Sequence, residues 1–171
     1  MKSLILAGAM FVALGSEAAA QMRAIIDTLP AKRSGPRYGA IWLSPAIADS
    51  ISVRNNNHKV NGTTSIFGWD FETQLMRNPK GVEPITSIVL GVAGLEQGLV
   101  LPSATWVVGI RTQEDFELGI GPNASLAGVA LAVTAGRTFH SGSLHIPIDV
   151  AWVGSKIGQR LSLTTGFNVT K

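Results

Sequence analysis

The chain has 171 residues, of which 46% are hydrophobic and only 15% are charged, and its formal net charge is +3. Soluble domains carry about 25% charged residues, so this chain is short of the groups that normally cover a water-facing surface. The absence of cysteine excludes disulfides, thiolate metal sites and an acylated lipoprotein cysteine. No basic run is longer than Lys32-Arg33, which argues against nucleic-acid binding.

An export signal is predicted at the N-terminus. Lys2 supplies a positive charge, Leu4–Leu14 forms an apolar core, and Ala18-Ala19-Ala20 fits a small-residue cleavage site. We therefore expect residues 1–20 to be a signal peptide and Gln21 to begin the mature protein. The competing interpretation is a transmembrane anchor, but the apolar run is much shorter than the about 20 residues that a spanning helix needs.

The rest of the chain is predicted to be one β domain. Residues 21–37 are expected to be an extended N-terminal lead-in, and residues 38–171 to form the barrel. Over most of this length apolar and polar residues alternate, as in strands with two different environments. The predicted strands are, in chain order, 38–53, 66–75, 85–94, 104–111, 116–126, 129–139, 144–152 and 161–169. Pro45 interrupts the first of them, and Ala127-Gly128 is the turn at which the apolar residues change from even to odd positions.

The composition of the polar face decides between two all-β folds. A soluble barrel or sandwich puts the apolar face inside, whereas a membrane barrel turns it toward lipid. The polar face is mostly Gly, Ala, Ser, Thr and Asn, which suits a narrow lumen better than a water-covered exterior. We therefore predict a small antiparallel up-and-down β-barrel of eight strands that spans a membrane. Arg137 falls on the apolar face of its strand, so we expect it near a rim.

Four segments of the chain resemble a family of uncharacterised bacterial outer-membrane-type β-barrel proteins. The segments are Phe67–Glu72, Gly94–Gly98 with Leu101–Ser103, Phe116–Asn123 and Leu161–Asn168. Together they extend over roughly the last two-thirds of the mature chain. The resemblance implies a barrel and export, and little about activity.

A set of ionisable residues is predicted to point into the lumen: Asp70, Glu72, Arg111, Glu117, His145 and Asp149. One interpretation is an ion or proton path. We favour a network that neutralises itself and packs the interior, because buried charges must be paired. Arg111 is then expected beside Glu117 across its hairpin, or beside Asp70 and Glu72 across the lumen. Three widely spaced histidines give no metal motif, and we expect no cofactor.

A lipid-modifying enzyme is the catalytic alternative, with His140, Ser141, Ser143 and His145 as its candidate residues. Adjacent residues of a strand point to opposite faces, and His140-Ser141 is expected in a turn. Ser143, His145 and Asp149 share a face but are too far apart along one strand for a hydrogen-bonded triad.

These observations predict a non-catalytic barrel of the bacterial outer membrane with a structural or interaction role. Its expected partners are outer-membrane lipid and other envelope proteins, and not nucleic acid. Two alternatives remain open at this point. One is the lipid-modifying enzyme of the same membrane, and the other is a soluble periplasmic ligand-binding β-barrel.

Overall fold

The computed structural model describes residues 32–54, 59–76, 78, 81–141 and 144–170. The predicted signal peptide and its cleavage site therefore lie outside the described residues. No helix within the described part of the chain is long and apolar enough to cross a membrane.

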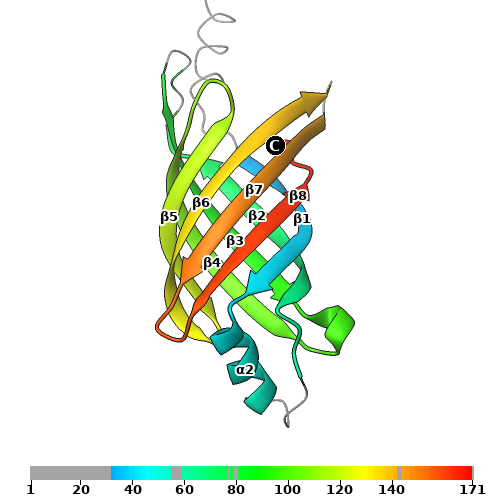
Figure 1. Ribbon diagram of the computed structural model, residues 1–171. Coiled ribbons are helices and arrows are strands. Elements are labelled where there is room, and N and C mark those ends of the chain that lie inside the picture. The colour runs from blue at the N-terminus through cyan, green and yellow to red at the C-terminus, as the bar shows by residue number, and fades with distance from the viewer. Residues whose placement is uncertain (1–31, 55–58, 77, 79–80, 142–143, 171) are drawn as a thin grey trace, which may run out of the picture.

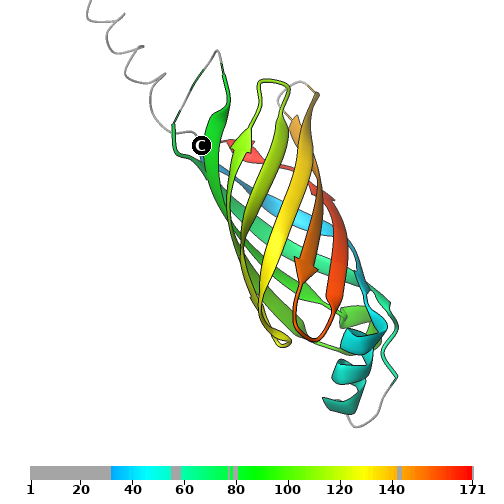
Figure 2. The same ribbon diagram turned by 60° about the vertical axis from the view of Figure 1, so that its left-hand side comes forward.

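Eight antiparallel strands form a closed barrel, as Figures 1 and 2 show from two sides. The strands are β1 (Lys32–Leu43), β2 (Thr63–Gln74), β3 (Glu83–Ala93), β4 (Leu101–Arg111), β5 (Phe116–Ser125), β6 (Gly128–Ser141), β7 (Leu144–Gly154) and β8 (Gln159–Gly166). Each strand pairs with the next along the chain, and β1 pairs with both β2 and β8 to close the barrel. The short β9 (Val169–Thr170) continues along β1 in the register of β8. The predicted all-β, up-and-down fold is confirmed.

The first strand differs from its prediction at both ends. β1 begins at Lys32, inside the segment expected as a lead-in, and ends at Leu43. Pro45, expected to interrupt a strand, instead begins the helix α2 (Pro45–Arg54). Proline suits the first helical position because its fixed φ is already helical and its missing N–H has no partner to lose there. The backbone carbonyl of Ser44 accepts bonds from Ile47 and Ala48, which form the first turn.

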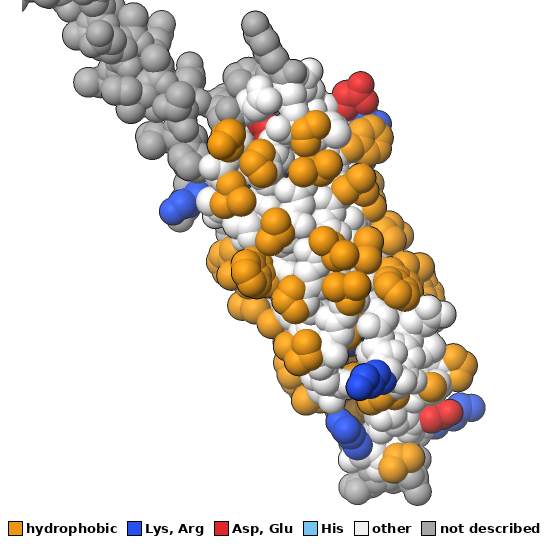
Figure 3. Space-filling view, turned by 90° about the vertical axis from the view of Figure 1, so that its left-hand side faces the viewer, with side chains coloured by type: hydrophobic (Ala, Val, Ile, Leu, Met, Phe, Trp, Pro, Cys, Tyr) orange, Lys and Arg blue, Asp and Glu red, His pale blue; other side chains and the backbone are white. Residues whose placement is uncertain are grey.

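Apolar side chains cover the outside of the barrel wall. In Figure 3 the wall between the two ends is hydrophobic and uncharged, and the lysines, arginines and acidic residues in view lie toward the ends. The exposed residues of the central strands include Phe67, Trp69, Trp106, Val108, Leu118, Leu131, Val133, Ile148 and Trp152. Their neighbours along the strands, among them Asp70, Val107 and Ala132, are buried in the interior. The predicted apolar and polar faces are therefore the outer and inner faces of the barrel.

Arg137 is the cation that sequence alternation placed on the apolar face. Its guanidinium lies 4.6 Å from the ring centroid of Phe116 and 5.3 Å from that of Phe139. Phe116 is the first residue of β5, so the three side chains lie near the barrel end that is opposite α2. Aromatic faces attract a cation, and here they hold the guanidinium at the rim.

Candidate functional site

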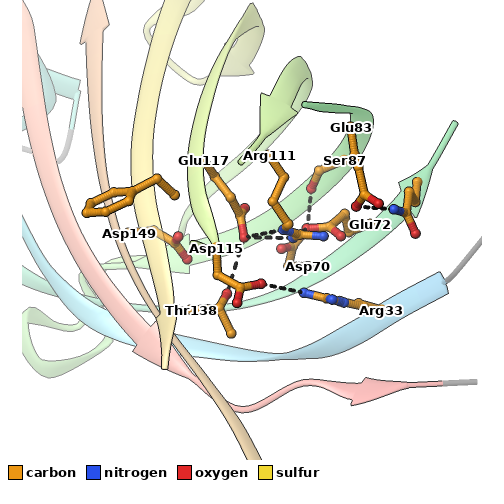
Figure 4. Close-up of polar contacts among 12 residues, drawn as sticks. Arg33, Asp70, Glu72, Glu83, Ser87, Arg111, Asp115, Glu117, Thr138 and Asp149 are labelled. Carbon is orange, nitrogen blue, oxygen red and sulfur yellow. Dashed lines mark hydrogen bonds and ion pairs between the residues drawn. The ribbon is translucent and has the colours of Figure 1, made fainter. Parts of the chain in front are cut away.

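Arg111 lies in the middle of a charged cluster inside the barrel (Figure 4). Its side chain is only 2% exposed, and its Nε and Nη2 atoms donate to Glu117 Oε1 at 3.0 and 2.6 Å. Nη2 also pairs with Glu72. Arg111 and Glu117 face each other across the β4–β5 hairpin, whereas Glu72 belongs to β2 and is reached across β3. Of the partners left open by the sequence, Arg111 therefore contacts Glu117 and Glu72.

A second guanidinium, that of Arg37, holds the other two carboxylates. Arg37 Nη2 donates to Asp70 Oδ2 at 2.9 Å, and its Nε lies 3.3 Å from Asp149 Oδ2. Ser87 donates to the other oxygen of Asp70. Gly136 leaves room for Asp149, because a Cβ at this position would lie 2.2 Å from Asp149 Oδ1. The sequence analysis does not identify Arg37, because it predicts an extended lead-in for residues 21–37. The alternation continues back from Tyr38 and is the signal that places Arg37 on the inner face.

The charged cluster thus joins two guanidiniums (Arg37 and Arg111) with four carboxylates (Asp70, Glu72, Glu117 and Asp149). Each guanidinium connects carboxylates of two different strands, and Arg37 on β1 reaches β7 across β8. These bonds brace the barrel across its interior in addition to the ladder between neighbouring strands. Every carboxylate of the cluster contacts a guanidinium, as buried charges require. Four carboxylates share two guanidiniums, however, so the cluster does not neutralise itself when all six groups are ionised.

His145 lies outside this cluster. Its ring packs edge-on against His140 at a centroid distance of 4.5 Å. His140 Nε2 is 2.7 Å from Asp115 Oδ2, and Arg33 Nη1 is 3.8 Å from the other oxygen of Asp115. Of the six residues predicted to face the lumen, five therefore belong to the charged cluster, which Arg37 completes. The sixth, His145, lies nearer the end of the barrel.

The residues proposed for a lipid-modifying enzyme do not form a triad among the described residues. His140 and Ser141 belong to β6 and not to a turn, so they point to opposite faces. The His140 side chain is hydrogen-bonded to Asp115, and no serine hydroxyl among the described residues is its partner, so a nucleophile is missing from this pair. Ser143 lies outside the described residues. Within the described ranges no three histidine, aspartate or glutamate side chains are grouped so that they could hold a metal ion.

At the barrel end away from Arg137, α2 follows β1 and lies beside the mouth of the barrel (Figure 1). Ile47 and Ala48 of the helix are buried against the mouth, together with Val60 and Leu99 of the neighbouring connections. Arg54 Nη1 donates to the carbonyl of Leu126 at 2.8 Å and so fastens the helix to the β5–β6 turn. A cavity of about 260 Å³ remains beneath α2. A second cavity of about 130 Å³ lies deeper in the lumen, next to the charged cluster.

Glu96 fastens another connection at this end. It belongs to the short 3-10 helix η1 (Leu95–Gln97) and accepts hydrogen bonds from the hydroxyls of Thr64 and Ser65 and, at 2.9 Å, from the backbone N–H of Ser65. These donors, the Ser65 hydroxyl first, lower the pKa of Glu96 from 4.5 to about 2. η1 is thereby held against the start of β2.

Stability should therefore depend on the charge of Glu96 at low pH. Because the folded pKa is the lower one, the stabilisation is complete above about pH 4.5 and is lost as the pH falls toward about 2. Thermal unfolding of the wild type and of Glu96→Gln, compared across this range, should show a difference at neutral pH that shrinks with acidification. A difference that stays constant with pH would mean that the carboxylate charge does not hold η1.

The sequence matches no protein-family profile and no curated protein. A solved structure described under the heading of de novo design of transmembrane β-barrels aligns with 84% of this chain and 96% of its own, at 12% identity and a TM-score of 0.44.

Proposed function

We propose that this protein is a non-catalytic β-barrel that spans the outer membrane of a bacterium and serves a structural or interaction role there. The observation that carries the proposal is the inversion of the usual pattern of burial. Large apolar side chains are exposed around the wall, while Arg37, Asp70, Glu72 and Arg111 are buried inside. An exposed apolar area of this extent is stable in lipid and promotes aggregation in water.

The outward tryptophans support the same environment. The indole nitrogens of three of the four donate to side chains of neighbouring strand positions: Trp69 to Ser34 at 2.6 Å, Trp106 to Thr86 at 2.9 Å and Trp152 to Gln159 at 3.1 Å. Each bond joins a donor and an acceptor on the outer wall. Water would satisfy such groups at no cost, whereas in hydrocarbon an unpaired polar group costs several kcal/mol.

A soluble periplasmic barrel is less well supported. It would need the apolar face inside, lining the ligand cavity, and the exposed positions of β4 to β7 argue against this. Catalysis is not assigned, since the charged groups of the lumen are engaged with one another and no serine among the described residues is hydrogen-bonded to His140.

Fractionation of cells that express the full chain tests the location directly. We expect the protein in the outer-membrane fraction, with a gel mobility that changes when the sample is boiled. Recovery in the soluble periplasmic extract, with no heat-dependent mobility, would contradict it.

Orientation in the membrane gives a sharper test. Outer-membrane barrels have short turns on the periplasmic side and longer connections outside, and the longest connection here, residues 44–62, carries α2. We therefore expect α2 outside and the 112–115 turn in the periplasm. The chain has no cysteine, so a single introduced thiol shows on which side of the membrane its segment lies. Ala46→Cys reports the side of α2, and Glu114→Cys reports the side of the 112–115 turn. Ala46→Cys should react with an impermeant maleimide on intact cells, and Glu114→Cys only after the outer membrane is permeabilised; the reverse pattern would contradict the orientation.

A further inference from the structure

The cavity beneath α2 has mainly aliphatic walls. They are formed by Ile41, Ile47, Ile51, Ile66, Leu99 and Leu101, among others. Its volume of about 260 Å³ lies just below the roughly 300–1,000 Å³ typical of small-molecule sites. Such a space suits one short hydrocarbon chain and is too small for the paired chains of a phospholipid.

Arg160 lies where this cavity meets the deeper one. Its side chain lines both cavities and crosses the interior from β8 to β5, where Nη1 donates to Ser125 Oγ at 3.1 Å and Nη2 donates to Asn123 Oδ1. Neither acceptor is charged. A guanidinium has five N–H donors, so donors remain for a further acceptor.

The other two lumen arginines show what Arg160 lacks. Arg37 and Arg111 each contact two carboxylates. Among the residues that the structure describes, no carboxylate lies within ion-pair distance of Arg160. A cation in apolar surroundings is costly unless an anion pairs with it, and an anionic group entering the cavity would supply that pair.

Part of the cavity lining is exposed at the α2 end of the barrel. Val100, Pro102 and Leu126 line it and are themselves exposed. α2 and its Arg54–Leu126 bond lie over this cavity.

We propose that this cavity binds a single-chain anionic amphiphile, with its head group on Arg160 and its hydrocarbon chain between the barrel mouth and α2. A fatty carboxylate is the simplest ligand of this kind. The site is a property of the barrel interior, so it can be tested in purified protein and does not depend on the orientation or the cellular location proposed above.

Dodecanoate labelled with ¹³C at the carboxyl carbon is a suitable probe. The full mature chain, folded in bilayer discs, should give a carboxyl resonance distinct from that of dodecanoate in protein-free discs. A carboxylate held by a guanidinium stays ionised at lower pH, so the bound resonance should titrate at lower pH than the bilayer one. Arg160→Gln should weaken binding by roughly 10- to 100-fold, the worth of a charge-assisted hydrogen bond.

Two further variants separate the site from general effects of charge and folding. Ser50→Phe, on α2 and facing the cavity, should abolish the bound resonance by filling the space while Arg160 and the strands are unchanged. Arg137→Gln, on the outer wall, should leave binding unaltered. The proposal is overturned if the wild type gives no bound resonance, if folded Arg160→Gln or Ser50→Phe binds like the wild type, or if uncharged dodecanol displaces the probe as well as unlabelled dodecanoate does.

Discussion

Arg111→Met alone is expected to destabilise the folded barrel by roughly 3–5 kcal/mol, which is the usual cost of breaking a buried ion pair by removing one partner. The reason is that Glu72 and Glu117 would both remain in the lumen without their shared cation. Arg111→Met combined with Glu72→Gln or Glu117→Gln should cost much less than the sum of the single changes. Equilibrium unfolding in lipid or detergent, arranged as double-mutant cycles, measures this non-additivity, for which coupling of about 0.5–3 kcal/mol is typical.

Asp70→Asn supplies the matched control for these cycles. Asp70 lies in the same charged cluster, but the structure pairs it with Arg37 and Ser87. Its coupling to Arg111 should therefore be small, and its coupling to Arg37 large. Additive effects of Arg111 with both Glu72 and Glu117 would contradict the geometry of the cluster.

Val133→Arg is expected to cost about 2–4 kcal/mol in a bilayer, the range measured for arginine on the lipid face near the midplane of a barrel. Val133 lies near the middle of β6, points outward and is 42% exposed. Leu131 and Ile148 are exposed on the same wall and should behave similarly. Reversible unfolding into urea or guanidinium, from lipid vesicles, gives the free energies.

Two further substitutions on β6 distinguish the effect of lipid at Val133 from effects of position and of interior packing. Val129→Arg, near the β5–β6 turn and 77% exposed, should cost no more than about 1 kcal/mol because its charge lies near the interface. Ala132→Arg should fail in lipid and in detergent alike, because Ala132 is 0% exposed and lines the inner cavity, where an added guanidinium would be a further buried cation. Equal costs at Val129 and Val133 would show that the wall is not in a bilayer.

Alternation along the strands was sufficient to predict which residues face outward. A strand of period two has only two faces, so Trp106 and Arg111 could be assigned to opposite environments without knowing how the strands pair. The turn at Ala127-Gly128 was predictable for the same reason, since a change of parity needs an irregular position; Gly128 there has a φ of 98°.

Other features depend on information that a single strand does not contain. The choice of Glu72 and Glu117, and not Asp70, as partners of Arg111 depends on register across β3 and on which guanidinium lies nearer. Proline disfavours the interior of a strand but favours the first position of a helix, so Pro45 alone does not decide between them. The packing of Ile47 and Ala48 at the barrel mouth favours the helix. Arg160 is not identifiable from the sequence, because what distinguishes it is the lack of a nearby carboxylate among the described residues, and this depends on how the strands pair.

The pairing of β1 with β8 has a consequence for how the chain reaches its final form. Apart from this seam, which the β1–β9 pairing extends, every pairing joins strands that are consecutive in the chain and can form hairpins early. The seam joins Arg37 to Gly166 and Leu43 to Arg160, so it must wait for almost the entire chain. Contacts so distant in sequence are slow to form. Until they do, the first and last strands are both unpaired edges of the kind that associate with other chains. The interval before closure is thus when this protein is most exposed to misassembly, and a chain truncated before Gln159 would remain in that state.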